Sequence, residues 1–223
     1  MPEIIVALDG MEWNAALDVA RSLRGLVWGF KVNDLLHSGH YWTPMLKPHG
    51  GLMFDPKLHD IPNTMRNTVR QLLARGPDFL TVHASAGPAA VAAAVEAAGT
   101  DCKIVAVTVL TSLSDADCVA AFGTPRSITV AKLAQIAAAA GASGIVCAGE
   151  DLPFVRETPI IKMCPGVRPD GRLAQDDQKA GGWAGDADFI IVGRPVTSSD
   201  DPVAAVEKIK ESYGTQTPKQ KEN

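Results

Sequence analysis

Apolar residues along the chain fall into two alternating patterns. Short runs rich in Val and Ile recur eight times, and longer Ala- and Leu-rich segments with helical spacing lie between them. The runs predict eight strands: Ile4 to Asp9, Val27 to Val32, Gly51 to Asp55, Phe79 to His83, Lys103 to Val109, Gly144 to Cys147, Ile160 to Cys164 and Phe189 to Gly193. The clearest predicted helices are Asn14 to Leu23, Asn63 to Leu73, Pro88 to Ala98, Ile128 to Ala140 and Pro202 to Tyr213.

Alternation of this kind predicts an α/β fold, a single-domain (β/α)8 TIM barrel closed on itself. A doubly wound open sheet would give a similar local pattern. The 223 residues, of which 46% are hydrophobic, suit one large domain rather than two small ones. We expect residues 1–214 to form the barrel and the polar residues 215–223 to form a disordered tail. The segment Ser114 to Ser127 supports no assignment.

Composition and charge narrow the classes of partner. The formal net charge is -4, and Lys and Arg are scattered, which argues against a nucleic-acid partner. The four cysteines have no C-x-x-C spacing, and we expect them to be reduced and buried, as in the cytoplasm. The start of the chain lacks a basic segment, and no apolar run approaches the roughly 18 residues of a membrane span. We therefore expect a cytoplasmic protein with no membrane partner.

Polar side chains recur where the predicted strands end: Asp9, Lys31, Asp55, Lys57, His83, Thr111, Ser112, Gly193 and Arg194. Taken singly, each has a structural explanation, such as a helix cap, a solvated strand end or a core histidine. Asp55 and Lys57 stand two apart, so their side chains project to the same side of a strand, and alone they could be a structural ion pair. Together the set predicts an active site at the carboxyl rim of a barrel.

A long Gly- and Pro-rich loop follows Cys164 and carries Arg168 and Gln178. Barrels commonly bind phosphate with the loops after the last two strands, so we expect a phosphate site at this loop and at Gly193 and Arg194. A plain surface loop with a solvated arginine is the alternative. The glycine motifs of nucleoside triphosphate and dinucleotide sites do not occur, and no Cys/His cluster has the spacing of a metal site.

The residues from Asp55 to Thr64, DPKLHDIPNT, resemble the D-x-K-x-x-D-I-x-x-T signature of the orotidine 5'-phosphate decarboxylase family. The resemblance runs from Ile4 to about Tyr213. Its further motifs occur in order: ALD at Ala7 to Asp9, FKV at Phe30 to Val32, TVHA at Thr81 to Ala84, VLTS at Val109 to Ser112, PGVRP at Pro165 to Pro169, DDQ at Asp176 to Gln178 and VGRPVT at Val192 to Thr197.

This resemblance implies decarboxylation of orotidine 5'-monophosphate to UMP, with neither a metal nor an organic cofactor. It implies that Lys57 is the proton donor, that Asp55 lies against the substrate carboxylate, and that Lys31 and Asp60 complete a charged array. The implied roles of the other residues are ribose binding by Asp9 and Lys31, pyrimidine binding by Thr111 and Ser112, and phosphate binding by Arg168, Gln178, Gly193 and Arg194. A homodimer is implied too, with Asp60 and Thr64 reaching the neighbouring site.

Two departures from the family pattern are Pro56, where a non-proline residue is usual, and Asn33, where glycine is frequent. Both concern backbone geometry rather than chemical groups. Two other functions stay open. One is a Mg2+-dependent 3-keto-gulonate-6-phosphate decarboxylase or hexulose-6-phosphate synthase, against which the HDIPNT and VLTS segments argue. The other is a non-catalytic barrel that binds phosphorylated ligands.

Overall fold

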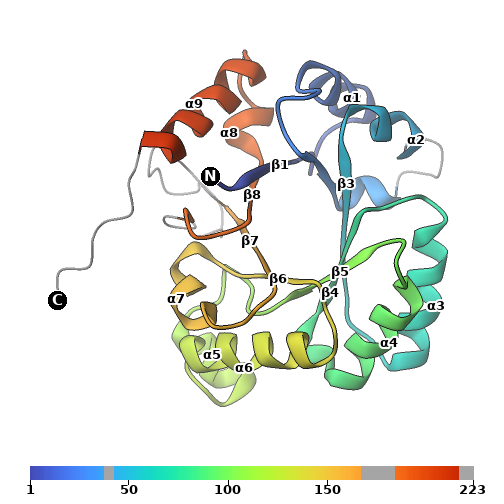
Figure 1. Cartoon of the computed structure of the whole chain (residues 1–223), viewed down its shortest axis with the longest axis vertical. Coiled ribbons are helices and arrows are strands. Elements are labelled where there is room, and N and C mark those ends of the chain that lie inside the picture. Colours follow the sequence, from blue (N-terminus) through green and yellow to red (C-terminus); the bar gives the residue numbers. More distant parts are fainter. Residues whose placement is uncertain (38–42, 167–183, 216–223) are drawn as a thin grey trace.

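A computed structural model of the chain describes residues 1–37, 43–166 and 184–215. Its eight parallel strands pair in chain order, and β1 pairs with β8, so the sheet closes into a barrel (Figure 1). The strands are β1 (Glu3–Ala7), β2 (Gly29–Val32), β3 (Gly51–Leu58), β4 (Phe79–His83), β5 (Lys103–Val107), β6 (Gly144–Val146), β7 (Ile161–Pro165) and β8 (Phe189–Val192). The predicted barrel is therefore confirmed, and the open sheet is excluded.

Helices surround this ring of strands and cover its outer face (Figure 1). The α-helices are α1 (Trp13–Ser22), α2 (Thr43–Leu46), α3 (Pro62–Leu73), α4 (Pro88–Ala98), α5 (Asp115–Phe122), α6 (Arg126–Ala139), α7 (Leu152–Val155), α8 (Arg194–Thr197) and α9 (Pro202–Thr215). Short 3-10 turns are η1 (Asp34–His37), η2 (Lys47–His49), η3 (Ala84–Ala86) and η4 (Gly149–Asp151). The predicted tail lies almost wholly outside the described residues, so the boundary at residue 214 stays a prediction.

The segment that the sequence left unassigned forms α5 and the start of α6. Ser114 caps α5, because its hydroxyl accepts from the Asp117 amide while the Asp117 carboxylate accepts from the Ser114 amide. Gly123 ends the helix with a left-handed φ of 75°. This capping box was present in the sequence, but α5 has only eight residues and one fully buried side chain, Cys118, so its hydrophobic signal was weak.

Aromatic rings fill the amino end of the barrel. The centroids of Trp28 and Phe79 are 4.8 Å apart, and the Phe189 ring lies 5.5 Å from Trp28 and 5.4 Å from Phe79. Gly51 makes room for them, since a Cβ there would come within 2.6 Å of the Trp28 ring. A buried apolar layer follows inside the barrel: Ile5, Ala7, Met53, Val105, Met163 and Ile191. The barrel is thus packed from below, and open space remains at its carboxyl rim.

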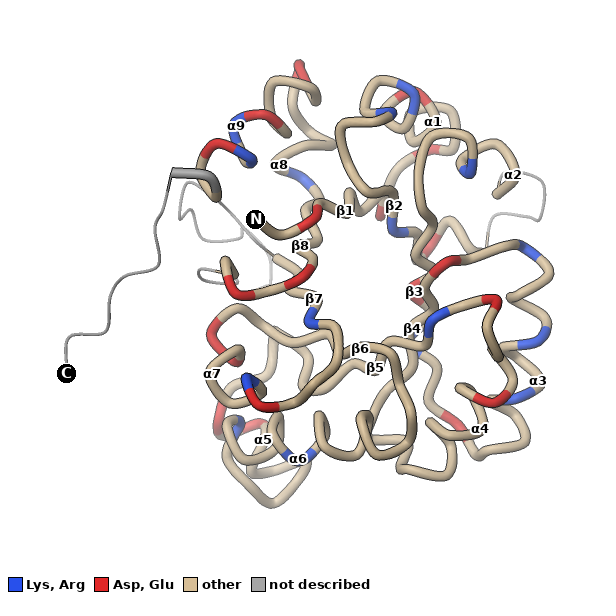
Figure 2. The backbone as a smooth tube through the Cα atoms, viewed as in Figure 1, with Lys and Arg blue, Asp and Glu red and all other residues tan. Residues whose placement is uncertain are grey.

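Charged residues of both signs are interspersed around the molecule (Figure 2). In the described ranges, no helix combines the length and apolar character that crossing a membrane requires.

Candidate active site

A cavity of about 700 Å³ opens at the carboxyl ends of the strands. Residues from β1, β2, β3, β5, β6, β7 and β8 line it, together with the loops that follow some of these strands and with α8. Most of the predicted site residues reach it: Asp9, Lys31, Asp55, Lys57, Thr111, Ser112, Gly193 and Arg194. The strand-end pattern therefore located the cavity.

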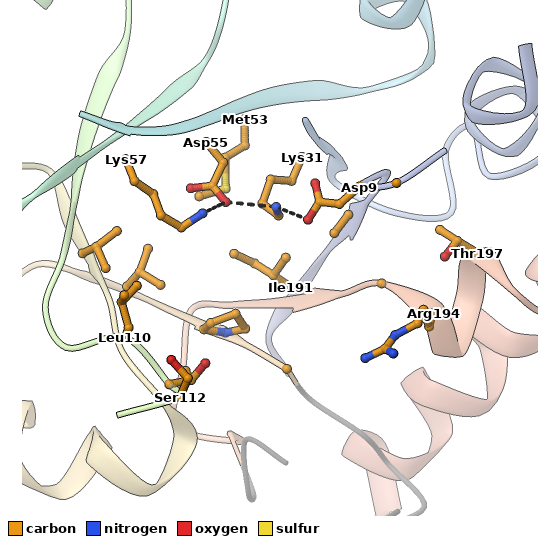
Figure 3. A pocket seen from close by; sticks show the side chains of 18 of the residues that line it. Asp9, Lys31, Met53, Asp55, Lys57, Leu110, Ser112, Ile191, Arg194 and Thr197 are labelled. Carbon is orange, nitrogen blue, oxygen red and sulfur yellow. Dashed lines mark hydrogen bonds and ion pairs between the residues drawn. The ribbon is translucent and has the colours of Figure 1, made fainter. Parts of the chain in front are cut away.

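Four charged residues form a continuous chain along one wall of the cavity, which we call the lumen cluster: Asp9, Lys31, Asp55 and Lys57 (Figure 3). The Lys31 ammonium lies 2.6 Å from Oδ2 of Asp9 and 2.9 Å from Oδ2 of Asp55. The Lys57 ammonium lies 2.7 Å from the same Asp55 oxygen. Negative and positive groups therefore alternate, and one carboxylate oxygen serves two lysines.

Burial and charge together fix the ionisation of the two inner residues. Burial alone would raise the pKa of Asp55, but the adjacent Lys31 and Lys57 outweigh it and hold that pKa below its usual value. For Lys31, burial acts to lower the pKa, and the charges of Asp55 and Asp9 reverse this and raise it. Both groups are therefore charged at neutral pH, although their side chains are each only 7% exposed.

Lys57 is the cation of the cluster that is open to the cavity, and Asp9, at the other end of the cluster, is its exposed anion. The Lys57 side chain is 33% exposed, against 7% for Lys31 and Asp55. In Figure 3 its amine stands at one end of the dashed line of ion pairs, over the cavity. An ammonium in this position can stabilise negative charge that develops in the cavity, and it can donate a proton there.

Polar residues that do not belong to the lumen cluster line other parts of the cavity. Arg194 and Thr197, at the two ends of α8, lie well away from Lys57, and Ser112 lies below it on the loop after β5 (Figure 3). The cavity can therefore bind a ligand that carries an anionic group at one end and reacts at the other.

Two predicted residues lie apart from this cavity. Asp60 is exposed and accepts a hydrogen bond from the Ile61 amide at 2.7 Å, and Thr64 lies half-buried in the first turn of α3. Neither lines the cavity of its own chain. Arg168 and Gln178 fall outside the described residues, so their predicted phosphate contact stays a prediction. His83 lies beside His59, and burial, followed by the charges of His59 and Lys57, lowers its pKa.

Sequence reasoning missed the apolar part of the lining and two polar residues behind it. Met53, Val107 and Ile191 point into the barrel. The two-residue alternation of side-chain direction along each strand could have indicated this from the sequence. Thr81 and Asn33 contact Asp55 from the two neighbouring strands, and although the family motifs drew attention to both residues, their contacts could not be predicted, because they depend on strand register. Within residues 1–37, 43–166 and 184–215, no three His, Cys, Asp or Glu side chains gather as a metal site would require.

Comparisons with known proteins give one consistent result. The family model "Orotidine 5'-phosphate decarboxylase / HUMPS family" matches residues 2–209. The orotidine 5'-phosphate decarboxylase of Sphingopyxis alaskensis is 38% identical over 220 residues, covering 93% of this chain and 97% of the relative. That of Anaeromyxobacter sp. strain K is 42% identical over 168 residues, covering 71% and 73%. The crystal structure of orotidine 5'-phosphate decarboxylase from Lactobacillus acidophilus superposes with a TM-score of 0.78 at 29% identity, covering 96% of this chain and all of the other.

Proposed function

The chain belongs to the orotidine 5'-phosphate decarboxylase / HUMPS family and decarboxylates orotidine 5'-monophosphate (OMP) to UMP in pyrimidine biosynthesis, and we propose that the lumen cluster performs this chemistry. The observation that supports the proposal is the alternating chain of charges that ends on the cavity-facing Lys57. The test is spectrophotometric: loss of the orotate chromophore is followed with the wild-type protein and with variants of each cluster member.

The reaction makes a specific electrostatic demand. When CO2 leaves C6 of the pyrimidine, the electron pair of the broken bond stays on that carbon, and no conjugated carbonyl is placed to absorb it. The protein supplies the stabilisation instead, through a fixed positive charge. Lys57 fills this role, first as a cation beside the carbanion and then as the donor of the proton that C6 takes up.

Asp55 has two tasks in this mechanism. Its carboxylate holds the Lys57 ammonium at 2.7 Å and orients it. It also meets the substrate carboxylate as a like charge, and that repulsion is relieved as CO2 departs. The lowered pKa of Asp55 supports both tasks, because a protonated carboxyl would repel nothing and would orient Lys57 less firmly.

The remaining cavity residues bind the parts of the substrate that do not react. Arg194 and the amide of Gly193 bind the phosphate, together with the predicted Arg168 and Gln178. Thr111 and Ser112 contact the pyrimidine. Lys31 and Asp9 contact ribose hydroxyls, and the 45% exposure of the Asp9 side chain leaves room for that contact. Phosphate binding far from C6 lets remote binding energy hold the carboxylate against Asp55.

A homodimer with shared active sites completes the proposal. Asp60 and Thr64 lie outside the cavity of their own chain, and Ile61 beside them is an apolar side chain that is 67% exposed. We propose that these residues meet the partner, where Asp60 approaches Lys57 and Thr64 approaches the substrate. Mixing the inactive variants Asp60→Ala and Lys57→Ala tests this. Randomly paired dimers recover roughly a quarter of the wild-type sites if the site is shared, and none if each chain acts alone.

A cytoplasmic location is also proposed. It is supported by Cys102, Cys118, Cys147 and Cys164, which are all buried free thiols, as a reducing compartment would keep them. Thiol labelling of protein denatured directly from cells should find four reactive cysteines per chain, whereas two or fewer would contradict the assignment.

The family model covers both the nucleotide decarboxylase and the magnesium-dependent alternative, so the model alone does not separate these two functions. The relatives described above are named for the nucleotide enzyme. The activity assay separates the two functions directly: OMP turnover that persists in EDTA supports the proposal, and turnover that EDTA abolishes would favour metal chemistry.

A further inference from the structure

The backbone at Lys57 departs from ordinary strand geometry. Its φ is 48°, and it is the only non-glycine residue of the described ranges with a positive φ. At the same place the register of β3 against β4 shifts: Phe54 pairs with Leu80, and the pairing resumes only at Leu58 with Val82. A left-handed conformation is unfavourable for a side chain with a Cβ, so something in the surroundings has to hold Lys57 there.

Thr81, in the middle of β4, occupies the place that this shift opens. Its hydroxyl oxygen accepts a hydrogen bond from the Lys57 amide at 3.0 Å and donates one to Oδ1 of Asp55 at 2.8 Å. The residue is completely buried. An ionised carboxylate only accepts hydrogen bonds and an amide only donates, so the direction of both bonds is fixed. One side chain therefore joins the backbone of the proposed proton donor to its carboxylate partner.

Because of this contact, the two oxygens of the Asp55 carboxylate have different partners. Oδ1 faces Thr81, and Oδ2 meets both Lys31 at 2.9 Å and Lys57 at 2.7 Å. Without the hydroxyl, the carboxylate could rotate and the two lysines would no longer share one oxygen.

Asn33 contacts the peptide between Asp55 and Pro56 from the β2 side of β3, whereas Thr81 contacts this region from β4. The Asn33 side-chain amide donates to the Asp55 carbonyl oxygen at 2.8 Å, just beyond the end of β2. Pro56, the next residue, has no N–H to lose when the ladder is interrupted. The two departures from the family pattern thus fit the kink between Asp55 and Lys57, which is held by Asn33 on one side and Thr81 on the other.

We propose that Thr81 is a positioning residue for the decarboxylation. This proposal rests on the function proposed for the lumen cluster. The Thr81 hydroxyl holds Lys57 in the left-handed conformation that turns its amine to the cavity, and it orients Asp55 toward both lysines. The phosphate-binding groups lie across the cavity and do not depend on Thr81. Loss of the hydroxyl should therefore affect the chemical step much more than substrate binding.

The kinetic test compares Thr81→Val, which keeps the shape and removes the hydroxyl, with Thr81→Ser, which keeps the hydroxyl. Thr108→Val is the matched control, because Thr108 is also a buried threonine, but among the described residues its hydroxyl bonds to the Val146 carbonyl and to no charged group. We expect Thr81→Val to lower kcat about 100-fold, with KM for OMP changed by less than about threefold. Thr81→Ser should recover most of kcat, and Thr108→Val should keep it within about twofold. A Thr81→Val enzyme with wild-type kcat per folded molecule, or equal losses in all three variants, would overturn the proposal.

A crystal structure of Thr81→Val gives a readout that does not depend on activity. We expect Lys57 to leave the positive φ region and its ammonium to move away from Oδ2 of Asp55. Unchanged geometry at both residues would overturn the positioning role, even if the wild-type protein decarboxylates OMP. Failure of the wild-type protein to turn over OMP would instead refute the proposed function, and the geometry of the variant would still decide the role of Thr81.

Discussion

Among the described residues, two ion clusters have buried members, and they differ in how far their charges are paired. One is the lumen cluster. The other, which we call the loop anchor, pairs Arg126 at the start of α6 with Asp151 in η4 through two bonds of 2.8 and 2.7 Å. Arg126 also donates to the carbonyls of Leu110 and Leu113, which flank the cavity residues Thr111 and Ser112.

The two clusters differ in how many of their charged groups have all their hydrogen-bonding positions paired within the protein. In the loop anchor, the planar guanidinium directs its N–H groups to two carboxylate oxygens and two carbonyls, and Asp151 is fully buried. In the lumen cluster, Lys57 has one ion-pair partner among the described residues and a third of its side chain open to the cavity. Burial of charge alone therefore does not identify a candidate active site; a buried cluster with a charge that also faces a cavity does.

Replacement of Lys57 by Ala should give the largest effect and separate the clusters most sharply. We expect kcat to fall about 10⁴-fold or more, which corresponds to about 5.5 kcal/mol, because both the stabilising cation and the proton donor are lost. The melting temperature should hardly change, since Lys31 still pairs with Asp55. Lys162→Ala is the control, because Lys162 donates to backbone carbonyls near the amino end of β7. Substantial turnover by the Lys57 variant would mean that the proton comes from elsewhere.

Replacement of Arg126 by Met should have the reverse effect, a large loss of stability with a small loss of kcat. It leaves the Asp151 charge buried without its partner, so we expect the free energy of unfolding to fall by about 3–5 kcal/mol, measured in urea. The kcat of the folded fraction should fall by less than about tenfold, and KM should rise as the loop after β5 loosens.

A double variant tests whether the loop anchor is purely structural. Arg126→Met combined with Asp151→Leu removes both charges, and it should regain part of the stability that the single variant loses. Equal destabilisation of both variants would show that the loss comes from packing rather than from an unpaired charge. The corresponding change in the lumen cluster, Lys31→Met with Asp55→Leu, should leave the enzyme inactive.

Replacement of Arg194 by Ala addresses the far side of the cavity. We expect kcat/KM for OMP to fall about 100-fold, about 2.7 kcal/mol, because charge-assisted bonds to the phosphate are lost. Arg66→Ala is the control, since Arg66 pairs with Glu96 at 3.1 Å on the surface. Unchanged kinetics in the Arg194 variant would remove the phosphate assignment.

The smallest expected effect is a difference in pH dependence. The pKa of Lys31 is raised above 10.5, so its contribution to stability is fully present below pH 10.5 and is lost as the pH rises through the folded-state pKa. The pKa of Arg126 is raised too: burial acts to lower it, but the hydrogen bond and charge of Asp151 outweigh burial. Above pH 10.5 the stability difference between wild type and Lys31→Met should shrink, whereas that between wild type and Arg126→Met should persist. Parallel slopes would contradict this ranking.

The sequence predicted three members of the lumen cluster, with Asp60 as the fourth where the structure has Asp9 beside Lys31, and it missed the loop anchor. Asp55, Lys57 and Lys31 stand at strand ends, and the barrel brings all strand ends to one rim, so topology alone brings them together. Arg126 and Asp151 lie 25 residues apart, and their contact depends on how α6 packs against η4. The partners of Thr81 escaped prediction similarly, because the register shift after Phe54 decides which residues it faces.

The aromatic rings of Trp28, Phe79 and Phe189 give the barrel the form of a cup rather than a tube. Because they pack across its base, the cavity lies at the carboxyl rim, at the opposite end of the barrel. With Lys57 as the proposed proton donor, we expect OMP, UMP and the proton that restores Lys57 to pass through this rim. We therefore expect an ordered exchange, in which the nucleotide leaves before the proton reaches Lys57.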